Sequence, residues 1–147
     1  MVLLVLQIVQ VGILWLHDWL KLGPLNDARA ARDIDGTGRL IVVTVVQSLP
    51  FTLFLAASMC YGRASLPLSL RRELLFCYAL LLVGEIRAWW WPYLVRADPR
   101  RAARYRSLFG KTHAFLPQRN GMVPNTLHCA LHAATAATCL MLAAGMI

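Results

Sequence analysis

A single carboxylate, Glu85, follows an apolar run that extends from Leu74 to Val83. Such a run is expected inside a membrane, where a carboxylate is costly unless a partner, a proton or water compensates its charge. An intramembrane glutamate is therefore a candidate functional group, and a carboxyl in these surroundings suits general acid or base catalysis. We predict that Glu85 is the central catalytic residue.

Histidines in the last third of the chain supply the complement to this carboxyl. His128 and His132 are one helical turn apart, so both imidazoles lie on the same face of a predicted last helix. Either ring could exchange a proton with a substrate while Glu85 acts as its counterpart. His113, in the loop before that helix, is a further candidate. The sequence thus predicts acid–base catalysis by Glu85, His128, His132 and His113.

A second group of residues has the chemistry to bind a substrate. Cations would hold an anionic head group, and aromatic rings would flank a developing positive charge, as in the isomerisation or cyclisation of an isoprenoid-like molecule. Amides, an imidazole and a carboxylate would complete a polar wall. These predicted substrate-binding residues are Arg87, Trp89, Trp90, Tyr93, Lys111, Arg119, Asn125, Gln47, His17 and Asp18.

The elements that must position these residues are apolar helices. The chain of 147 residues is 59% hydrophobic, with a mean hydropathy of +0.56, well above the apolar share of ordinary soluble domains. Four stretches approach the roughly 20 residues that cross a bilayer. We therefore predict an all-α integral membrane protein, a single transmembrane domain over residues 1–147 built as a four-transmembrane-helix bundle. The predicted spans are residues 2–20, 40–60, 70–95 and 125–147.

The basic residues indicate how these spans are oriented. The chain has a net charge of +8, but its first and third loops together hold eleven lysines and arginines, against three in the second loop. By the positive-inside bias, loops 21–39 and 96–124 are cytoplasmic and both termini lie outside, in a multi-pass protein of the cell inner (plasma) membrane. The basicity then reflects topology and attraction to membrane lipids, and we expect no nucleic acid partner.

Loop lengths predict how the helices are connected. The second loop is short, which favours the second and third spans as antiparallel neighbours. The third loop, residues 96–124, is too long for a simple connector. Within it, Asp98 followed by Pro99 predicts a helix start, and Asn125 is the predicted N-cap of the last helix. We expect a structured cytoplasmic cap over the mouth of the bundle, between the third and fourth helices.

This topology brings the candidate side chains to the cytoplasmic half, in an aromatic-lined, inward-facing pocket. We favour a small integral membrane enzyme, an acid–base isomerase, cyclase or transferase acting on a lipophilic small molecule. Two alternatives remain open: a metal- or haem-binding protein that uses His128, His132 and Glu85, and a proton-coupled small transporter or accessory subunit. No cofactor is predicted, a metal belongs only to the first alternative, and a homo-oligomer is left open.

Overall fold

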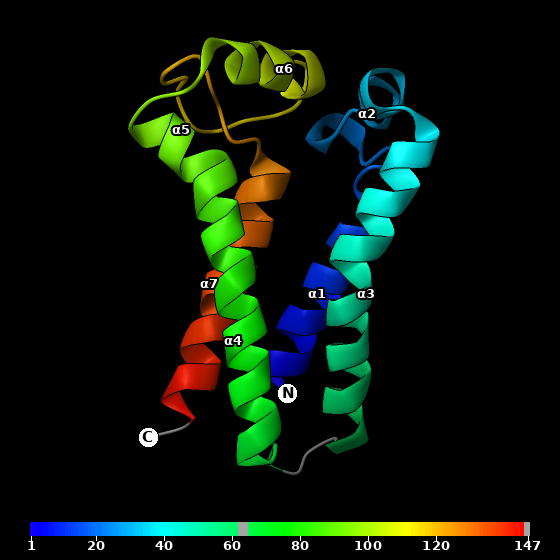
Figure 1. The fold of residues 1–147 in the computed structure, drawn as a ribbon, viewed down its shortest axis with the longest axis vertical. Helices are drawn as coiled ribbons and strands as arrows, with labels where there is room; N and C mark the ends of the chain where they lie inside the picture. The colour runs from blue at the N-terminus through cyan, green and yellow to red at the C-terminus, as the bar shows by residue number, and fades with distance from the viewer. Residues whose placement is uncertain (62–64, 146–147) are drawn as a thin grey trace.

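The computed structural model describes residues 1–61 and 65–145, and this part of the chain is all-helical (Figure 1). One segment, η2, is a π-helix that continues α4 without a break. The elements in chain order are α1 (Val2–Leu16), η1 (Gly23–Leu25), α2 (Ala28–Asp35), α3 (Thr37–Tyr61), α4 (Leu68–Glu85), η2 (Ile86–Trp90), α5 (Trp91–Leu94), α6 (Pro99–Phe109) and α7 (Thr126–Ala144).

Three helical stretches are long and apolar enough to cross a membrane: α3, the continuous Leu68–Leu94 that joins α4 to α5, and α7. They match the second, third and fourth predicted spans. The first apolar helix is shorter than predicted, because α1 ends at Leu16 and the chain turns over residues 17–20. At 1.5 Å per residue its 15 residues extend about 22 Å, less than the roughly 30 Å of a hydrocarbon core.

The long helices pack in the order α3, α1, α7, α4. The consecutive helices α3 and α4 are antiparallel, as predicted, but they are not packed neighbours along their length, because α3 packs on α1 and α4 on α7, which lie behind the space between them (Figure 1). Between these two helices, Phe51 contacts Tyr78 with ring centroids 5.0 Å apart. Both rings belong to the largest buried apolar cluster, with Leu14, Leu74 and Leu131. The bundle is therefore open on the α3–α4 side above this contact.

Indole groups fix α1 against α3. Trp15 Nε1 donates to Thr52 Oγ1 at 2.8 Å, and Trp19 Nε1 donates to Thr44 Oγ1 at 3.0 Å. Because α3 is apolar over most of its length, these directional bonds set its register on α1 where apolar packing alone would not.

A cap lies at one end of the bundle, made of α2, α6 and the segments around them, while α1 begins and α7 ends toward the opposite end (Figure 1). Asp98 is the N-cap of α6, with Pro99 in its first turn, and its side chain accepts from the amides of Arg100 and Arg101, as predicted. Backbone bonds join distant segments within the cap: His113 N donates to Pro24 O at 2.6 Å, and Thr126 N donates to His113 O at 2.9 Å.

Candidate functional site

The cap is attached where α4 changes its helical register. Pro92 has no backbone N–H, so it leaves Ala88 O without its α-helical donor and Arg87 O without its π-helical donor. Side chains of α6 bond both carbonyls: Tyr105 Oη donates to Ala88 O at 3.0 Å, and Arg101 Nη1 donates to Arg87 O at 3.4 Å. The π-helix also turns Trp89 inward, where it is buried.

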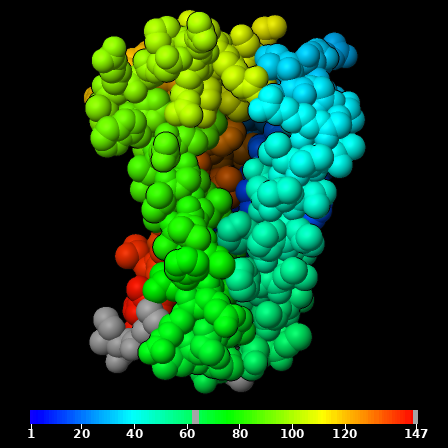
Figure 2. Space-filling view, in the orientation of Figure 1, coloured from blue at the N-terminus to red at the C-terminus, as the bar shows by residue number. Residues whose placement is uncertain are grey.

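A cavity of about 310 Å³ lies between the cap and the bundle, at the lower end of the usual size of small-molecule sites. It is lined by the end of α1, by α2, by one face of α3, by η2, by α6 and by the start of α7. Figure 2 shows a furrow at this level between α4 and α3, with atoms of α7 and α1 at its floor and α6 above. Of the predicted site residues it gathers His17, Asp18, Gln47, Trp89 and His128.

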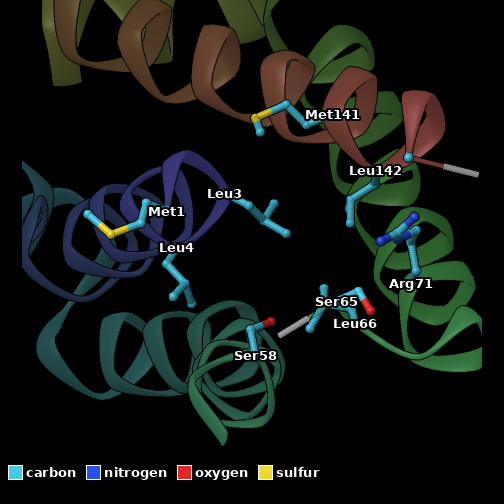
Figure 3. Close-up of a pocket in the computed structure, with 10 residues that line it drawn as sticks. Met1, Leu3, Leu4, Ser58, Ser65, Leu66, Arg71, Met141 and Leu142 are labelled. Atoms are coloured by element: carbon cyan, nitrogen blue, oxygen red, sulfur yellow. The ribbon is translucent and has the colours of Figure 1, made fainter. Parts of the chain in front are cut away.

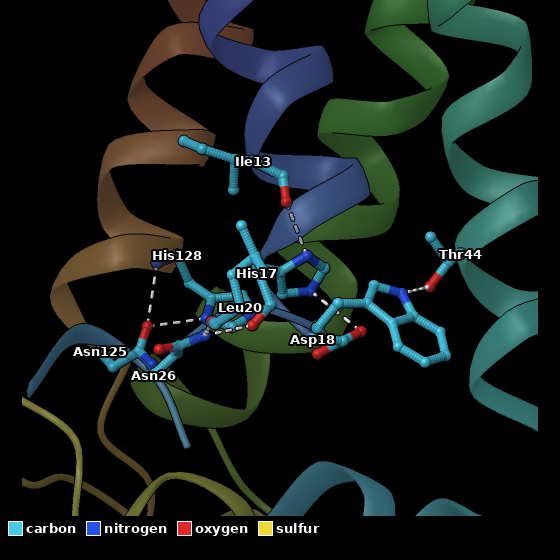
Figure 4. Close-up of polar contacts among 9 residues, drawn as sticks. Ile13, His17, Asp18, Leu20, Asn26, Thr44, Asn125 and His128 are labelled. Atoms are coloured by element: carbon cyan, nitrogen blue, oxygen red, sulfur yellow. Dashed lines mark hydrogen bonds and ion pairs between the residues drawn. The ribbon is translucent and has the colours of Figure 1, made fainter. Parts of the chain in front are cut away.

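His17 and Asp18 form a close pair at the floor of this cavity. His17 Nδ1 lies 2.8 Å from Ile13 O, and because a carbonyl only accepts, Nδ1 carries a hydrogen. Its Nε2 lies 3.3 Å from Asp18 Oδ2 (Figure 4), a distance at which a proton on either atom would join the two groups. Burial raises the pKa of Asp18, an effect that His17 partly offsets and Asp35 reinforces.

His128 is held in one orientation by Asn125. Asn125 Oδ1 accepts from His128 N at 2.9 Å and lies 2.7 Å from His128 Nδ1 (Figure 4). Its amide nitrogen donates to Leu25 O and Thr112 Oγ1, each at 3.2 Å, which fixes the direction of the Asn125 side chain. His128 Nδ1 is therefore a donor, and in the neutral ring Nε2 is the basic nitrogen.

Aromatic rings surround the His128 imidazole. The Trp89 ring lies over it with centroids 4.1 Å apart, and Phe109 meets it edge-on at 5.0 Å. Tyr105 also packs against the Trp89 ring, with ring centroids 4.6 Å apart. His17 approaches His128 edge-on with ring centroids 5.8 Å apart. Two imidazoles, one at the end of α1 and one on α7, thus share one aromatic-walled cavity.

His132 lies behind this cavity and has a different partner. It is buried, and its Nδ1 accepts from Trp90 Nε1 at 3.0 Å. Because an indole N–H can only donate, the neutral His132 ring carries its hydrogen on Nε2. This bond fixes η2 to α7, so His132 and Trp90 support the wall of the cavity and do not line it.

Glu85 does not line the cavity either. It is buried against α7, where Oε1 accepts from Thr135 Oγ1 at 2.9 Å, and the Gln10 amide lies 3.0 Å from the same hydroxyl. Oε2 is buried without a partner among the described residues. Thr135 is three residues beyond His132, about 4.5 Å further along α7. The carboxyl therefore belongs to a buried chain that links α1, α7 and α4.

The remaining predicted residues are spread over the cap and the outside. Tyr93 donates to Pro117 O at 3.0 Å and carries the Arg119 guanidinium 5.9 Å above its ring. His113 is exposed, with Nδ1 2.7 Å from Thr126 Oγ1. Arg87 lines an outer groove with Val83, and Lys111 lines a hollow beside α2. None of these lines the cavity.

Sequence reasoning missed a charged cluster at the edge of the cavity. Asp35 pairs with Arg39 at 3.6 Å and with Arg104, so one carboxylate joins α2, α3 and α6. The i,i+4 spacing of Asp35 and Arg39 was a visible signal, whereas Arg104 is 69 residues away. Sequence reasoning also missed Tyr105 and Phe109, because it did not predict how α6 packs against the bundle.

A second large hollow, of about 400 Å³, lies at the other end of the bundle (Figure 3). Its walls come from α1, α3, α4 and α7 and from the segment before α4, and among the described lining residues Arg71 is the one charged side chain. It offers little acid–base chemistry. Among the described residues, no three His, Cys, Asp or Glu side chains gather as metal ligands, so the suggested set of His128, His132 and Glu85 does not form there.

Comparison with known protein families, with curated proteins and with solved structures finds no match to this chain.

Proposed function

We propose that this protein is a small integral membrane enzyme that acts by acid–base catalysis on a lipophilic molecule with a polar head. In this proposal α1 joins the three longer helices as the fourth membrane-embedded helix. The cap and both of its loops face the cytoplasm, in keeping with the distribution of the basic residues.

The observation that carries the proposal is the placement of two differently bonded imidazoles on one cavity. His128 Nδ1 is bonded to Asn125, which leaves Nε2 as the proton acceptor, and a proton on the His17–Asp18 pair would make that pair the acid, with the two rings 5.8 Å apart between centroids. A base and an acid at this separation can act on neighbouring atoms of one substrate. The proposed step is a proton transfer: His128 Nε2 removes a proton from one position and the His17–Asp18 pair returns one to another, without net change in composition.

The opening between α3 and α4 supports access from the bilayer. Leu40, Val43 and Gln47 form one face of α3 along this opening. The outer faces of the helices carry large exposed apolar residues, such as Val46 and Val83. An acyl or isoprenoid tail can remain in lipid beside these faces while its head reaches the cavity, which is too small for the whole of such a molecule.

Solvent deuterium provides a test that does not require the substrate to be known. Purified protein in lipid nanodiscs is incubated in D2O with a total lipid extract of the host membranes, and the lipids are examined by mass spectrometry. We expect one lipid class to gain deuterium, and His128→Gln or Asp18→Asn to abolish the gain. Arg100→Gln, an exposed cap variant, should retain it. Incorporation that equals the protein-free blank, or that persists in His128→Gln, would refute the proposal.

The transporter alternative is favoured by the buried chain at Glu85. Thr135 Oγ1 lies 2.9 Å from Glu85 Oε1, and the Gln10 side chain bonds Thr135 and Thr138 from the side of α1. A buried carboxyl that is joined to a neighbouring helix by one hydroxyl is a group that could bind a proton. If Glu85 serves proton binding alone, Glu85→Gln leaves deuterium gain intact; if it is the catalytic acid predicted from sequence, the gain is lost.

A further inference from the structure

A hollow of about 580 Å³ lies beside the cavity, along α2, and it has a different chemical character. Its walls are mainly polar side chains, with the Trp19 ring at one side. Four cationic side chains line it: Lys21, Arg29, Arg32 and Lys111. They come from three places in the sequence, the turn after α1, the helix α2 and the loop after α6, so the concentration of charge is created by the fold.

The positive charge of this hollow is not neutralised within the described part of the chain. Asp27 is its one acidic lining residue, and the Asp27 carboxylate already accepts from Ala30 N at 3.0 Å as the N-cap of α2. Among the described residues, no carboxylate lies within 4 Å of any of the four cationic groups, since the acidic partners there go to His17, Arg39 and Arg104. A net charge of about +3 is therefore available to an anion.

The backbone around the hollow is fixed in place. The Asn26 side chain is buried, donates to His17 O and to Leu20 O at 2.6 Å, and accepts from Leu22 N at 2.7 Å (Figure 4). The bond from His113 N to Pro24 O holds the Lys111 loop against the same turn. A ligand would meet cations that are already gathered, without first ordering two loops.

The hollow lies at the depth of a lipid head group. Trp19 bonds Thr44 of α3, and the exposed apolar residues of α3 begin just before this point with Ile41 and Val42, which are 49% and 61% exposed. In the proposed orientation this is the inner surface of the bilayer, where anionic lipids attract basic side chains.

We propose that this hollow binds a phosphate-bearing anionic group, separate from the acid–base cavity. The group is the head of an anionic phospholipid or a free phosphate compound, and both present the oxygens that Lys and Arg recognise. The proposal uses the orientation given under the proposed function but none of its chemistry. Bound there, the anion would tie α2 to the α6–α7 loop by bridging Arg29 and Lys111.

The test is a titration of the detergent-solubilised full chain with phosphatidylglycerol, followed by native mass spectrometry, with phosphatidylcholine as the neutral lipid. We expect the double variant Arg29→Gln with Lys111→Gln to weaken phosphatidylglycerol binding about 30-fold, as expected for two lost surface cations. The matched control, Arg96→Gln with Arg100→Gln, removes the same charge from the cap outside the hollow and should weaken it by less than about threefold.

Two further arms complete the test. Arg29→Lys with Lys111→Arg keeps the charges and should restore binding, which distinguishes lost charge from misfolding. Inorganic phosphate that displaces the lipid identifies a free phosphate compound as an occupant, whereas displacement only by phospholipid identifies the head group. Equal weakening in the hollow and control variants, or equal binding of phosphatidylcholine, would overturn the proposal.

Discussion

The His17–Asp18 pair gives the cavity a measurable pH dependence. His17 Nδ1 faces the carbonyl of Ile13, and burial of the Asp18 carboxyl raises its pKa. The charge of Asp35, from α2, also raises the pKa of Asp18. The pKa of the proposed acid therefore depends on its surroundings and not on residue type alone.

We predict that Asp18→Asn stabilises the protein increasingly as pH rises. A folded-state pKa above the unfolded value of about 4 gives stability that is fully present below pH 4 and is lost as pH rises through the folded pKa. Asparagine does not titrate, so its thermal midpoint should exceed that of the wild type by more at about pH 7.5 than at about pH 4.5. Asp33→Asn, at an exposed carboxylate of α2, is the matched control. A midpoint difference that is constant with pH would contradict this prediction.

About a third of the residues that form the cavity wall could be predicted from their type and depth. His17, Asp18, Gln47, Trp89 and His128 were expected in one pocket and do line one. Glu85 was expected beside the imidazoles and instead bonds Thr135. Hydropathy gives the depth of a residue along a span, but the direction of its side chain depends on which helix lies beside it, and a single sequence contains little information on that.

Because of the π-helix, the directions of side chains along this helix were harder to predict than the apolar runs themselves. An inserted residue rotates everything after it by about 100°, so counting along a regular helix does not give the directions of Trp89 and Trp90. The helix N-caps at Asp98 and Asn125 were predictable because each depends on two or three adjacent residues. The attachment of α6 to η2 was not, since it depends on carbonyls that Pro92 leaves without donors.

This attachment predicts a coupling between Tyr105 and Pro92. Tyr105→Phe should lower the free energy of unfolding by about 1–2 kcal/mol, because Ala88 O loses the donor that replaces the missing amide. With Pro92→Ala the backbone regains an N–H, and the same Tyr105→Phe change should then cost about 0.5 kcal/mol or less. Burial raises the pKa of Tyr105, against the opposing effect of Arg101 and Arg104, so the phenol remains a donor at neutral pH.

Denaturant unfolding of the four proteins of this double-mutant cycle, followed by tryptophan fluorescence, measures the coupling. Ser107→Ala, at a hydroxyl that bonds only within α6, is the control and should be independent of Pro92. Equal costs of Tyr105→Phe in both backgrounds would show that Tyr105 does not replace the proline amide.

At the scale of the molecule, the short helix α1 determines the packing order. The apolar runs identified the long helices, but short loops favour sequential neighbours, and this bundle places α1 and α7 between α3 and α4. Polar bonds account for the choice: Trp15 and Trp19 bind α3, while Gln10 binds Thr135 of α7. In hydrocarbon such bonds outweigh apolar packing that lipid can equally provide. In the proposed orientation, the resulting opening between α3 and α4 would join the cavity to the bilayer.

The assignment of a phospholipid head group to the basic hollow depends on the cap facing the cytoplasm, and two cysteines can test this orientation. Cys60, exposed near the end of α3, lies at the end opposite the cap. Ser107 is exposed on α6 within the cap. With the other cysteines replaced by alanine, a membrane-impermeant maleimide added to intact cells should label Cys60 and should not label Ser107→Cys until the membrane is permeabilised. The eleven basic residues in the first and third loops oppose translocation of the cap, and the three in the second loop do not outweigh them. The reverse pattern would place the basic hollow at the outer leaflet, where anionic lipid is scarce, and would remove the argument for a phospholipid head group while leaving the chemistry of the His17–Asp18 pair untouched.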